Sequence, residues 1–507
     1  MYLGVHIDSQ LNFNQEIKYL RERASTRLST MKYMTSLKEG ANLEVQRKYY
    51  TACTRSLIDY AAPVLTNLTD RQKQSLEVLQ NNAARLMLGA PMWTKLGNLR
   101  EEANLPSLDS RIKVRNTCIL AKALVSDRNS YTKIRAATEL AKNREIQNYN
   151  TYSKQITDCV KDLGITNTLL ELKTDKPDNN FNIPPWETLG TKFNYAKLPR
   201  AKEQCSKEEL QRAATAAIAQ TETPESKVYY TDGTVDPETI TTGAAVYSSR
   251  FTGCWRVSNS ASTMQTELVA LKQALNYSLH NEQGPVTIHT DCKSAVQALQ
   301  QIKIKENKSL LKNIQYLLYQ HKTMNRQVTI NWIPSHIEIY GNDQADELAK
   351  TTRHIANVQI KVQPTISQIK KQLAPTIKNI MKEEIKTQAR LGSPSSNWYL
   401  QATDLVPHPV TKGTPRQLAV IIHRLRLGYK ATWQMIEGVA RPCNYCEDTP
   451  DAPLMHYLLE CPQTASLRDN RGNPLPLNND TAAKIAKNII EYIETYQDFL
   501  IRMPPPR

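Results

Sequence analysis

Four acidic side chains stand in separate sequence contexts that could bring their carboxylates together. Each acid lies at the end of an expected strand or within an expected helix, and the four are Asp232, Glu267, Asp291 and Asp346. Converging carboxylates repel one another, so they keep their charge only around bound cations. Two divalent ions about 4 Å apart, held by such a group, are the usual arrangement for phosphodiester cleavage.

The elements expected around these acids would fix them on rigid backbone. Lys227–Thr231 is rich in β-branched and aromatic residues and is followed by Asp232-Gly233, which predicts a strand with the acid near its end. Two further short strands are expected at 241–248 and 254–257. Turn residues separate all three, so we expect an antiparallel meander.

Helices and strands alternate in the rest of this region. Four leucines spaced by three and four residues predict a helix that Glu267 opens, capped by Ser262 or Thr263. Asp291 follows a strand over 286–290, at the carboxyl end where α/β sheets usually place their sites. The remaining expected elements are helices at about 294–302 and 310–319, a strand over 327–333 and a helix over 341–350 that carries Asp346.

This order of elements resembles the type 1 ribonuclease H family over about residues 226–353. The resemblance assigns the family's metal-binding carboxylates to Asp232, Glu267, Asp291 and Asp346, and its mobile histidine to His336. It implies a mixed five-stranded sheet with flanking helices. It also implies that two Mg²⁺ ions, or Mn²⁺, support hydrolysis of the RNA strand of an RNA–DNA hybrid. One departure is Glu338, which stands on the loop of His336 where the family often has glycine.

Each acidic context also has an ordinary structural interpretation. Thr-Asp-Gly alone is a common turn, and a glutamate early in a helix is usually a surface residue that suits the helix dipole. Five residue types in the right order on the right elements favour a nuclease over these separate explanations. A nucleic-acid-binding remnant of a retroelement, with its chemistry idle, stays open as the alternative function.

A second group of metal-binding residues lies nearer the C-terminus. It consists of Cys443, Cys446, His456 and Cys461, so that three of the nine cysteines fall close together with a histidine between them. Three thiolates and one imidazole make a closed tetrahedral set suited to structural Zn²⁺. The alternative is coincidental thiols in a small helical subdomain. The other cysteines are scattered, which favours a reducing compartment, nucleus or cytosol.

The length and net charge of the chain indicate which kinds of partner these motifs could serve. The chain has 507 residues and carries a formal net charge of +16, from 65 Lys and Arg against 49 Asp and Glu. The excess suits nucleic acid as a partner, although a solvated basic surface without a role would give the same charge. No stretch approaches the length of a membrane span, and the N-terminus lacks the features of a signal peptide. We therefore expect an RNA–DNA hybrid and other nucleic acid as partners, and no membrane; the oligomeric state stays open.

The flanking segments extend the resemblance to the C-terminal part of the pol polyproteins of non-LTR (LINE-type) retrotransposons. Residues 2–13 resemble the segment that leaves the reverse transcriptase palm, and residues 60–64, 80–85 and 88–91 resemble the thumb and connection that follow it. Pro184-Pro-Trp186 resembles a linker element of these proteins. Residues 424–428, followed by the cysteine cluster, resemble their C-terminal tail. No Asp-Asp dipeptide of a polymerase palm occurs in the chain. The resemblance therefore implies a piece of a truncated element, without polymerase activity.

The combined expectation is an α/β multi-domain chain, in which a mostly helical domain precedes the nuclease and a helical zinc-binding tail follows it. Residues 351–397 carry eight Lys and Arg against two Glu, which suits an arm that contacts phosphates, continued by Arg424, Arg426 and Lys430. The expected segments are 1–145 (thumb and connection remnant), 146–225 (irregular linker with a short helix), 226–353 (type 1 RNase H domain), 354–400 (basic helical linker) and 401–507 (helical region with the zinc cluster).

Overall fold

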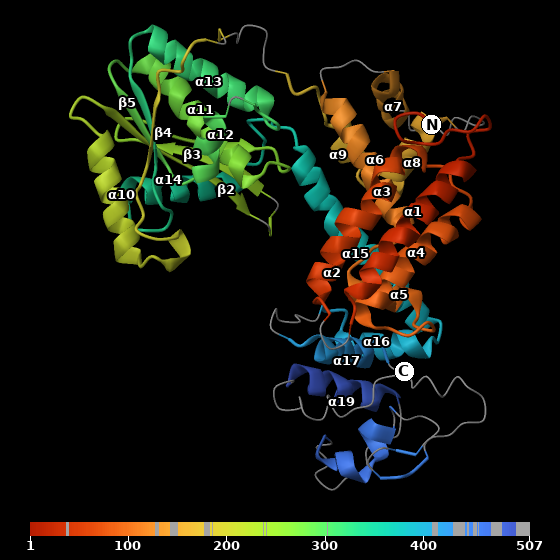
Figure 1. Cartoon of the computed structure of the whole chain (residues 1–507). Coiled ribbons are helices and arrows are strands. Elements are labelled where there is room, and N and C mark those ends of the chain that lie inside the picture. Colours follow the sequence, from red (N-terminus) through yellow and green to blue (C-terminus); the bar gives the residue numbers. More distant parts are fainter. Residues whose placement is uncertain are drawn as a thin grey trace. The chain divides into compact units, whose positions relative to one another are not determined.

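The structure is a computed structural model of the chain (Figure 1), and it places most of the 507 residues. The residues outside the description are 37–39, 127–130, 142–150, 177–182, 185, 237, 240, 302, 408–413, 429–441, 444–445, 450–453, 455, 468–478 and 493–507. Lys430, expected to contact phosphates, lies outside the described residues, as does Pro185 of the linker motif.

The chain divides into two compact units, and neither is continuous in sequence. One comprises Met1–Ile119, Ile146–Gly164 and Gln372–Arg507, and we call it the helical unit. The other comprises Leu120–Glu145 and Ile165–Lys371, and we call it the sheet unit. Within the described parts of the chain, no helix combines the length and the apolar character needed to cross a bilayer.

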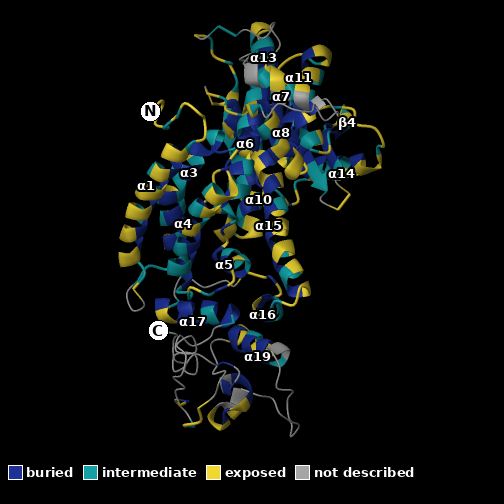
Figure 2. Cartoon of the chain, turned by 90° about the vertical axis from the view of Figure 1, so that its right-hand side faces the viewer, coloured by how far each residue is buried: buried dark blue, intermediate teal, exposed yellow. Residues whose placement is uncertain are grey.

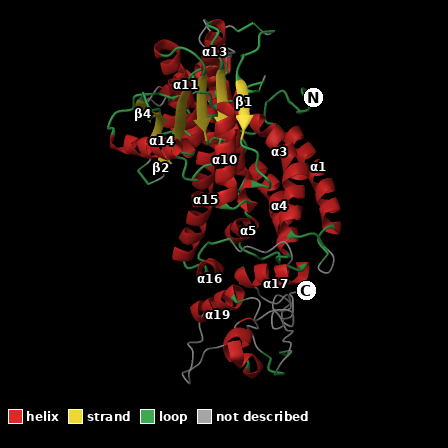
Figure 3. Ribbon diagram, turned by 90° about the vertical axis from the view of Figure 1, so that its left-hand side faces the viewer, coloured by secondary structure: helices red, strands yellow, loops and turns green. Residues whose placement is uncertain are grey.

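The sheet unit is built on one mixed sheet of six strands, three of which carry β labels in Figure 3. Its strands are β1 (Lys192–Tyr195), β2 (Lys227–Asp236), β3 (Thr241–Tyr247), β4 (Thr252–Val257), β5 (Val286–Thr290) and β6 (Val328–Trp332). The order across the sheet is β1-β6-β5-β2-β3-β4. Pairs among β1, β6, β5 and β2 are parallel, whereas β2, β3 and β4 form the antiparallel meander that the sequence predicted.

Helices cover this sheet and complete its core. The helices that contact its strands are α10 (Lys207–Thr221), α11 (Thr263–Asn281), α12 (Lys293–Leu299), α13 (Lys308–Thr323), α14 (Tyr340–Thr351) and η4 (Thr352–His354). The sheet unit also contains α7 (Tyr131–Ala141), α9 (Thr166–Leu170) and η3 (Lys202–Gln204). The helix α11 begins at a capping box in which Ser262 and Gln265 bond each other's backbone, as the expected cap at Ser262 requires. Its leucines pack against Ile288 of β5 and Ile330 of β6 in one buried cluster.

The sixth strand differs from the sequence prediction of five. β1 comes from the segment 146–225, which was expected to be largely irregular, and pairs with β6 from Lys192↔Thr329 to Tyr195↔Trp332. A strand of four residues is too short for a periodic signal, and its partner lies far along the chain. The same segment also contains α8 (Tyr152–Asp162), which belongs to the helical unit.

The helical unit combines helices from both ends of the described chain. Its elements are α1 (Asn14–Tyr33), α2 (Leu43–Tyr49), η1 (Tyr50–Thr54), α3 (Arg55–Ala61), η2 (Ala62–Val64), α4 (Asp70–Leu88), α5 (Leu96–Ala103), α8, α16 (Pro394–Thr403), α17 (Arg416–Arg426), η6 (His456–Glu460), η7 (Pro462–Leu467) and α19 (Asn479–Glu491). Two helices, α6 (Leu108–Val125) and α15 (Ile366–Arg390), run across the division between the units. In α15, Pro375 sits inside a continuous helix, within the segment that was expected to be a basic helical linker.

One side of α1 packs into the core of the helical unit. Ile17, Leu20, Ala24, Leu28 and Met31 are buried, while the opposite side of α1 is exposed (Figure 2). The same cluster contains residues from α4 and α5, together with Tyr399 of α16 and Leu427 after α17. The C-terminal segment therefore supplies part of the core of the N-terminal helices, although the sequence placed the two in separate domains.

One buried charged group ties α5 to α16 and α17. Glu102 accepts hydrogen bonds from Arg426 Nε at 2.8 Å and from the Tyr399 hydroxyl at 2.8 Å, and its carboxylate lies 2.6 Å from His423 Nδ1. Burial by itself would raise the pKa of Glu102, but the hydrogen bond with His423 and the charge of Arg426 outweigh it and hold the pKa below its ordinary value. Arg426 is 4% exposed, so its expected role as a phosphate contact is wrong.

Replacing Glu102 by Gln should destabilise the helical unit strongly. The change leaves the Arg426 guanidinium buried without a counter-charge, which costs about 3–5 kcal/mol in comparable buried pairs. We expect that loss in the free energy of unfolding at pH 7, measured by urea denaturation. Glu101→Gln, at the half-buried neighbouring position, is the matched control, and an equal loss there would contradict the special role of Glu102.

The buried pair of Glu102 and Arg426 also predicts how the free energy of unfolding depends on pH. Because the pKa of Glu102 is depressed in the folded state, its stabilisation is complete above the ordinary value of 4.5 and is lost as the pH falls toward the folded value. The difference in unfolding free energy between wild type and Glu102→Gln should therefore shrink between pH 5 and pH 2.

Candidate functional site

Three of the four predicted acids converge in the sheet unit. Asp232 lies on β2, Glu267 in the second turn of α11, and Asp291 directly after β5. One carboxylate oxygen from each lies within 4.8 Å of the others. Asp232 and Glu267 are buried, with 7% and 3% exposure, and Asp291 is half-buried. Three separate elements thus bring three of the four acids together.

The backbone around the acids explains how they come so close. A Cβ atom on Gly233 would lie 2.5 Å from the backbone nitrogen of Glu267, so only glycine lets the start of α11 approach β2 here. Asp291 is fixed on the other side, because the Trp332 indole donates a hydrogen bond to its carbonyl oxygen at 3.0 Å. Trp332 ends β6, so the parallel pairing of β5 with β6 sets the place of Asp291.

Asp346 lies beside this group but not within it. It stands on α14, where its carboxylate accepts a hydrogen bond from Lys350 Nζ at 2.7 Å. Its negative charge still contributes to raising the pKa of Asp232 and of Asp291, so it borders the three acids. The positive charge of Lys350 lowers the pKa of Asp232 and partly offsets this repulsion.

Electrostatics in the cluster favour a bound cation. Burial, followed by the charges of Asp291 and Asp346, raises the pKa of Asp232 to about 7. Burial and the charges of Asp232 and Asp291 also raise the pKa of Glu267 well above its usual range. Glu267 Oε2 is buried and has no hydrogen-bond partner among the described residues. Hard divalent cations prefer such carboxylate oxygens, so the residues present fit one or more Mg²⁺ ions.

His336 stands on the loop between β6 and α14, near Asp291. It is exposed, and its charge lowers the pKa of Asp291 against the effect of burial. Both His336 and Glu338 have left-handed backbone, with φ of 58° and 60°. Glu338 therefore occupies a conformation that glycine adopts without strain, which explains why glycine suits this position. His289, by contrast, is fully buried between Glu222 and Asn331, as expected for a packed residue.

Two lysines near the acids escaped the sequence analysis. Lys350 follows Asp346 by four residues, and this helical ion-pair spacing could have revealed it. Lys202 lowers the pKa of Asp291 more than any other charge, yet it lies 89 positions earlier in the sequence, in the segment expected to be a linker. No local pattern indicates such a contact.

The predicted zinc ligands also come together, in the helical unit. Cys443, Cys446, His456 and Cys461 each offer one atom within 4.8 Å of the others. The sulfurs of Cys443 and Cys461 lie 3.9 Å apart. Two sulfurs bound to one tetrahedral Zn²⁺ at about 2.3 Å are about 3.8 Å apart, so this spacing suits the ion. Glu460 lies 3.4 Å from His456 Nδ1, which leaves Nε2 to face the ion.

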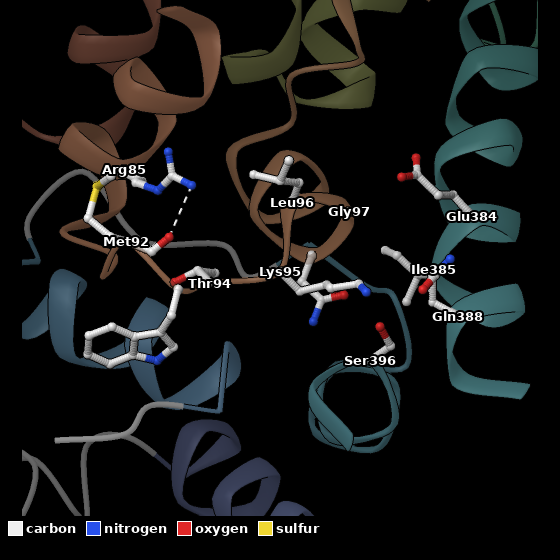
Figure 4. A pocket seen from close by; sticks show the side chains of 12 residues that line it. Arg85, Met92, Thr94, Lys95, Leu96, Gly97, Glu384, Ile385, Gln388 and Ser396 are labelled. Carbon is white, nitrogen blue, oxygen red and sulfur yellow. Dashed lines mark hydrogen bonds between the residues drawn. The ribbon is translucent and has the colours of Figure 1, made fainter. Parts of the chain in front are cut away.

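The helical unit also has an open pocket of about 470 Å³ between the α4–α5 loop and α15 (Figure 4). Arg85 at its edge donates a hydrogen bond to the Met92 carbonyl, and Glu384 and Gln388 line its other side. Its lining mixes single charges of both signs with apolar side chains, without a group of acids. It therefore offers no chemistry comparable to that of the carboxylate cluster.

The comparisons with known proteins bear on the sheet unit. Residues 224–354 match the family model described as RNase H. This span contains β2 to β6, α14 and all five expected site residues of the nuclease. Residues 224–354 form an RNase H domain. The chain is also 23% identical over 111 residues to "Probable RNA-directed DNA polymerase from transposon BS" of Drosophila melanogaster, covering 22% of this chain and 12% of that protein.

A second similar protein is also an RNA-directed DNA polymerase of a mobile element. "RNA-directed DNA polymerase from mobile element jockey" of Drosophila funebris is 24% identical over 112 residues, covering 22% of this chain and 12% of the relative. The matched stretch thus spans about an eighth of the length of either relative. Together with the RNase H domain, these similarities confirm the predicted relationship to pol polyproteins of non-LTR retrotransposons.

Replacing Asp232 by Asn should stabilise the RNase H domain when no metal is present. A carboxyl whose pKa is raised in the folded state stabilises the fold below its ordinary pKa of 3.8, and this stabilisation is lost as the pH rises through about 7. Asparagine carries no charge, so in EDTA at pH 8 we expect Asp232→Asn to raise the free energy of unfolding by roughly 1–4 kcal/mol. Urea denaturation measures the change.

The control is Glu347→Gln, which removes an exposed charge from α14 and should leave stability unchanged. Added Mg²⁺ should stabilise the wild type but not Asp232→Asn. If Mg²⁺ stabilised both proteins equally, the cation would not bind at this cluster.

The four residues near the C-terminus should hold one Zn²⁺ per chain. Cys446→Ser replaces a thiolate by a weak ligand while keeping the side chain's size, so metal analysis of the purified variant should show most of the zinc lost. Cys53→Ser, at a half-buried cysteine elsewhere in the helical unit, is the matched control. A wild-type protein purified without chelators and free of zinc would contradict the assignment.

Proposed function

We propose that the RNase H domain hydrolyses the RNA strand of RNA–DNA hybrids in a reaction that depends on two Mg²⁺ ions. The observation that carries this proposal is the group of three carboxylates within 4.8 Å, with a buried Glu267 oxygen that has no partner among the described residues. Such a group is costly to bury unless it serves a cation, and it lies in a domain that matches the RNase H family.

Each residue of the site then has a role. Asp232, Glu267 and Asp291 hold the cations, and Asp346 joins them by turning from Lys350. When bound, Mg²⁺ lowers the pKa of the attacking water and stabilises charge on the leaving oxygen. His336 is exposed on its loop near Asp291, where its imidazole exchanges a proton at the departing oxygen.

Nucleic-acid binding by the rest of the chain is part of the same proposal. Lys370, Lys371 and Lys378 are exposed on α15, and the chain carries a net charge of +16, which suits contacts with phosphates. Zn²⁺ at the cysteine cluster serves a structural role, because its four protein ligands leave no open position for a substrate. It would hold η6 and the segment around Cys443 together.

The test is incubation of purified full-length protein with a hybrid whose RNA strand is labelled. We expect cleavage of that strand with Mg²⁺ and none with EDTA, while single-stranded RNA and duplex DNA stay intact. Asp232→Asn and Asp291→Asn should each lower the rate by at least about 10³-fold, since each removes a charge that holds the cations.

Glu347→Gln is the control, because it removes an exposed carboxylate from the helix that carries Asp346. Wild-type rates in either Asn variant would show that the site is wrongly assigned. A wild-type protein that binds hybrid without cleaving it would support the alternative, an idle nucleic-acid-binding remnant.

A further inference from the structure

The segment before the RNase H match is built into the sheet unit. β1 adds an edge strand beside β6, and the Ala196 amide donates a hydrogen bond to the Trp332 carbonyl at 3.0 Å. Trp332 is the residue that fixes Asp291. The chain from β1 through α10 precedes residue 224, where the match to the family model begins. It thus contacts the site from outside the matched domain.

This segment reaches the loop of His336 by three separate contacts. Lys202 Nζ donates a hydrogen bond to the Ser335 hydroxyl at 2.7 Å, in a partly buried position. Lys207 Nζ forms an ion pair with Glu338 at 2.5 Å. Between them, Ile337 is 2% exposed and packs with Leu210 and Ala214 of α10. Every loop residue from 335 to 338 except His336 is therefore held by the earlier segment.

The loop needs such support because its backbone is strained. His336 and Glu338 both lie in the left-handed region, with φ of 58° and 60°. Backbone of this kind is unfavourable for residues other than glycine and persists where the surrounding contacts impose it. The imidazole of His336 stays exposed, so the contacts hold its backbone and leave its ring free for substrate.

We propose that Lys202 is a positioning residue of the nuclease, which holds the His336 loop in its working conformation through the Ser335 hydroxyl. This inference rests on the proposed function, since it assigns to Lys202 an effect on a step that His336 performs. Lys207 and Ile337 support the same loop, but Lys202 is the residue whose hydrogen bond reaches Ser335, directly before His336. The charge of Lys202 also lowers the pKa of Asp291, which agrees with its place at the edge of the site.

A direct contact between Lys202 and the hybrid is the rival interpretation, and the two predict different kinetics. Lys202→Met keeps the length of the side chain and removes its ammonium. If Lys202 positions the loop, the variant should lower kcat about tenfold and change KM less than threefold. Ser335→Ala removes the acceptor and should cause the same loss, and the double variant should be no slower than either single one.

The decisive measurement is a double-mutant cycle with His336→Ala. In that background Lys202→Met should change kcat less than twofold, because the group that it positions is gone. Lys197→Met, an exposed lysine of the same segment, is the control and should behave as wild type. A raised KM with unchanged kcat, or a full tenfold loss in the His336→Ala background, would overturn the inference.

Amide hydrogen exchange separates this inference from the proposed function. In the full chain without substrate, Lys202→Met should speed exchange in peptides covering 333–340 at least threefold, and Lys197→Met should not. If the wild type cleaves no hybrid but exchange rises, the proposed function fails and the structural part of the inference stands. If the wild type cleaves hybrid while Lys202→Met alters neither exchange nor kcat, the inference fails alone.

Discussion

Mutual repulsion of carboxylates in a buried place is the constraint on which the RNase H domain depends. Asp232, Glu267 and Asp291 lie within 4.8 Å of one another, and each has a raised pKa. Only stiff surroundings can hold such a group, and the fold supplies them: a central parallel pair for Asp232 and Asp291, and a helix start that touches the backbone of Gly233. The rest of the sheet and its helices hold these elements in place, so the fold keeps three like charges close together at a cost in stability.

The sequence indicated those parts of the structure whose signals are local. The strand before Asp232, the helix that carries Glu267 and the strand before Asp291 each combine a periodic pattern with a clear stop, and all three were predicted in place. β1 was missed because four residues carry no period and their partner strand is distant in sequence. The sequence analysis placed Asp346 in the cluster and missed its pairing with Lys350, because the rotamers of clustered acids depend on nearby charges that a motif does not contain.

In the helical unit, too, contacts between residues far apart in the sequence could not be predicted from local patterns. The sequence indicated a mostly helical N-terminal region, which the structure builds from helices such as α1 and α4. The sequence could not show which residues cover the apolar sides of these helices. They include Ile385, Tyr399 and Leu427, which lie hundreds of residues later in the chain. The arginines near 424–426 looked like free cations in the sequence. Instead, Arg426 neutralises Glu102, and Arg424 donates a hydrogen bond to the Gly89 carbonyl. The sequence could not predict these contacts, because only the fold brings the acid and the carbonyl close to the arginines.

The divided make-up of the helical unit also has a consequence for biogenesis. During synthesis, residues 1–119 leave the ribosome about 250 residues before the segment from Gln372 onward that completes their core. At roughly 5–20 residues per second this interval lasts on the order of tens of seconds, far longer than a small domain takes to fold. The nascent N-terminal helices must therefore wait with apolar surface uncovered while the sheet unit emerges and folds. Chaperones that shield nascent chains, and proteases that survey them, would act on this protein mainly in that interval.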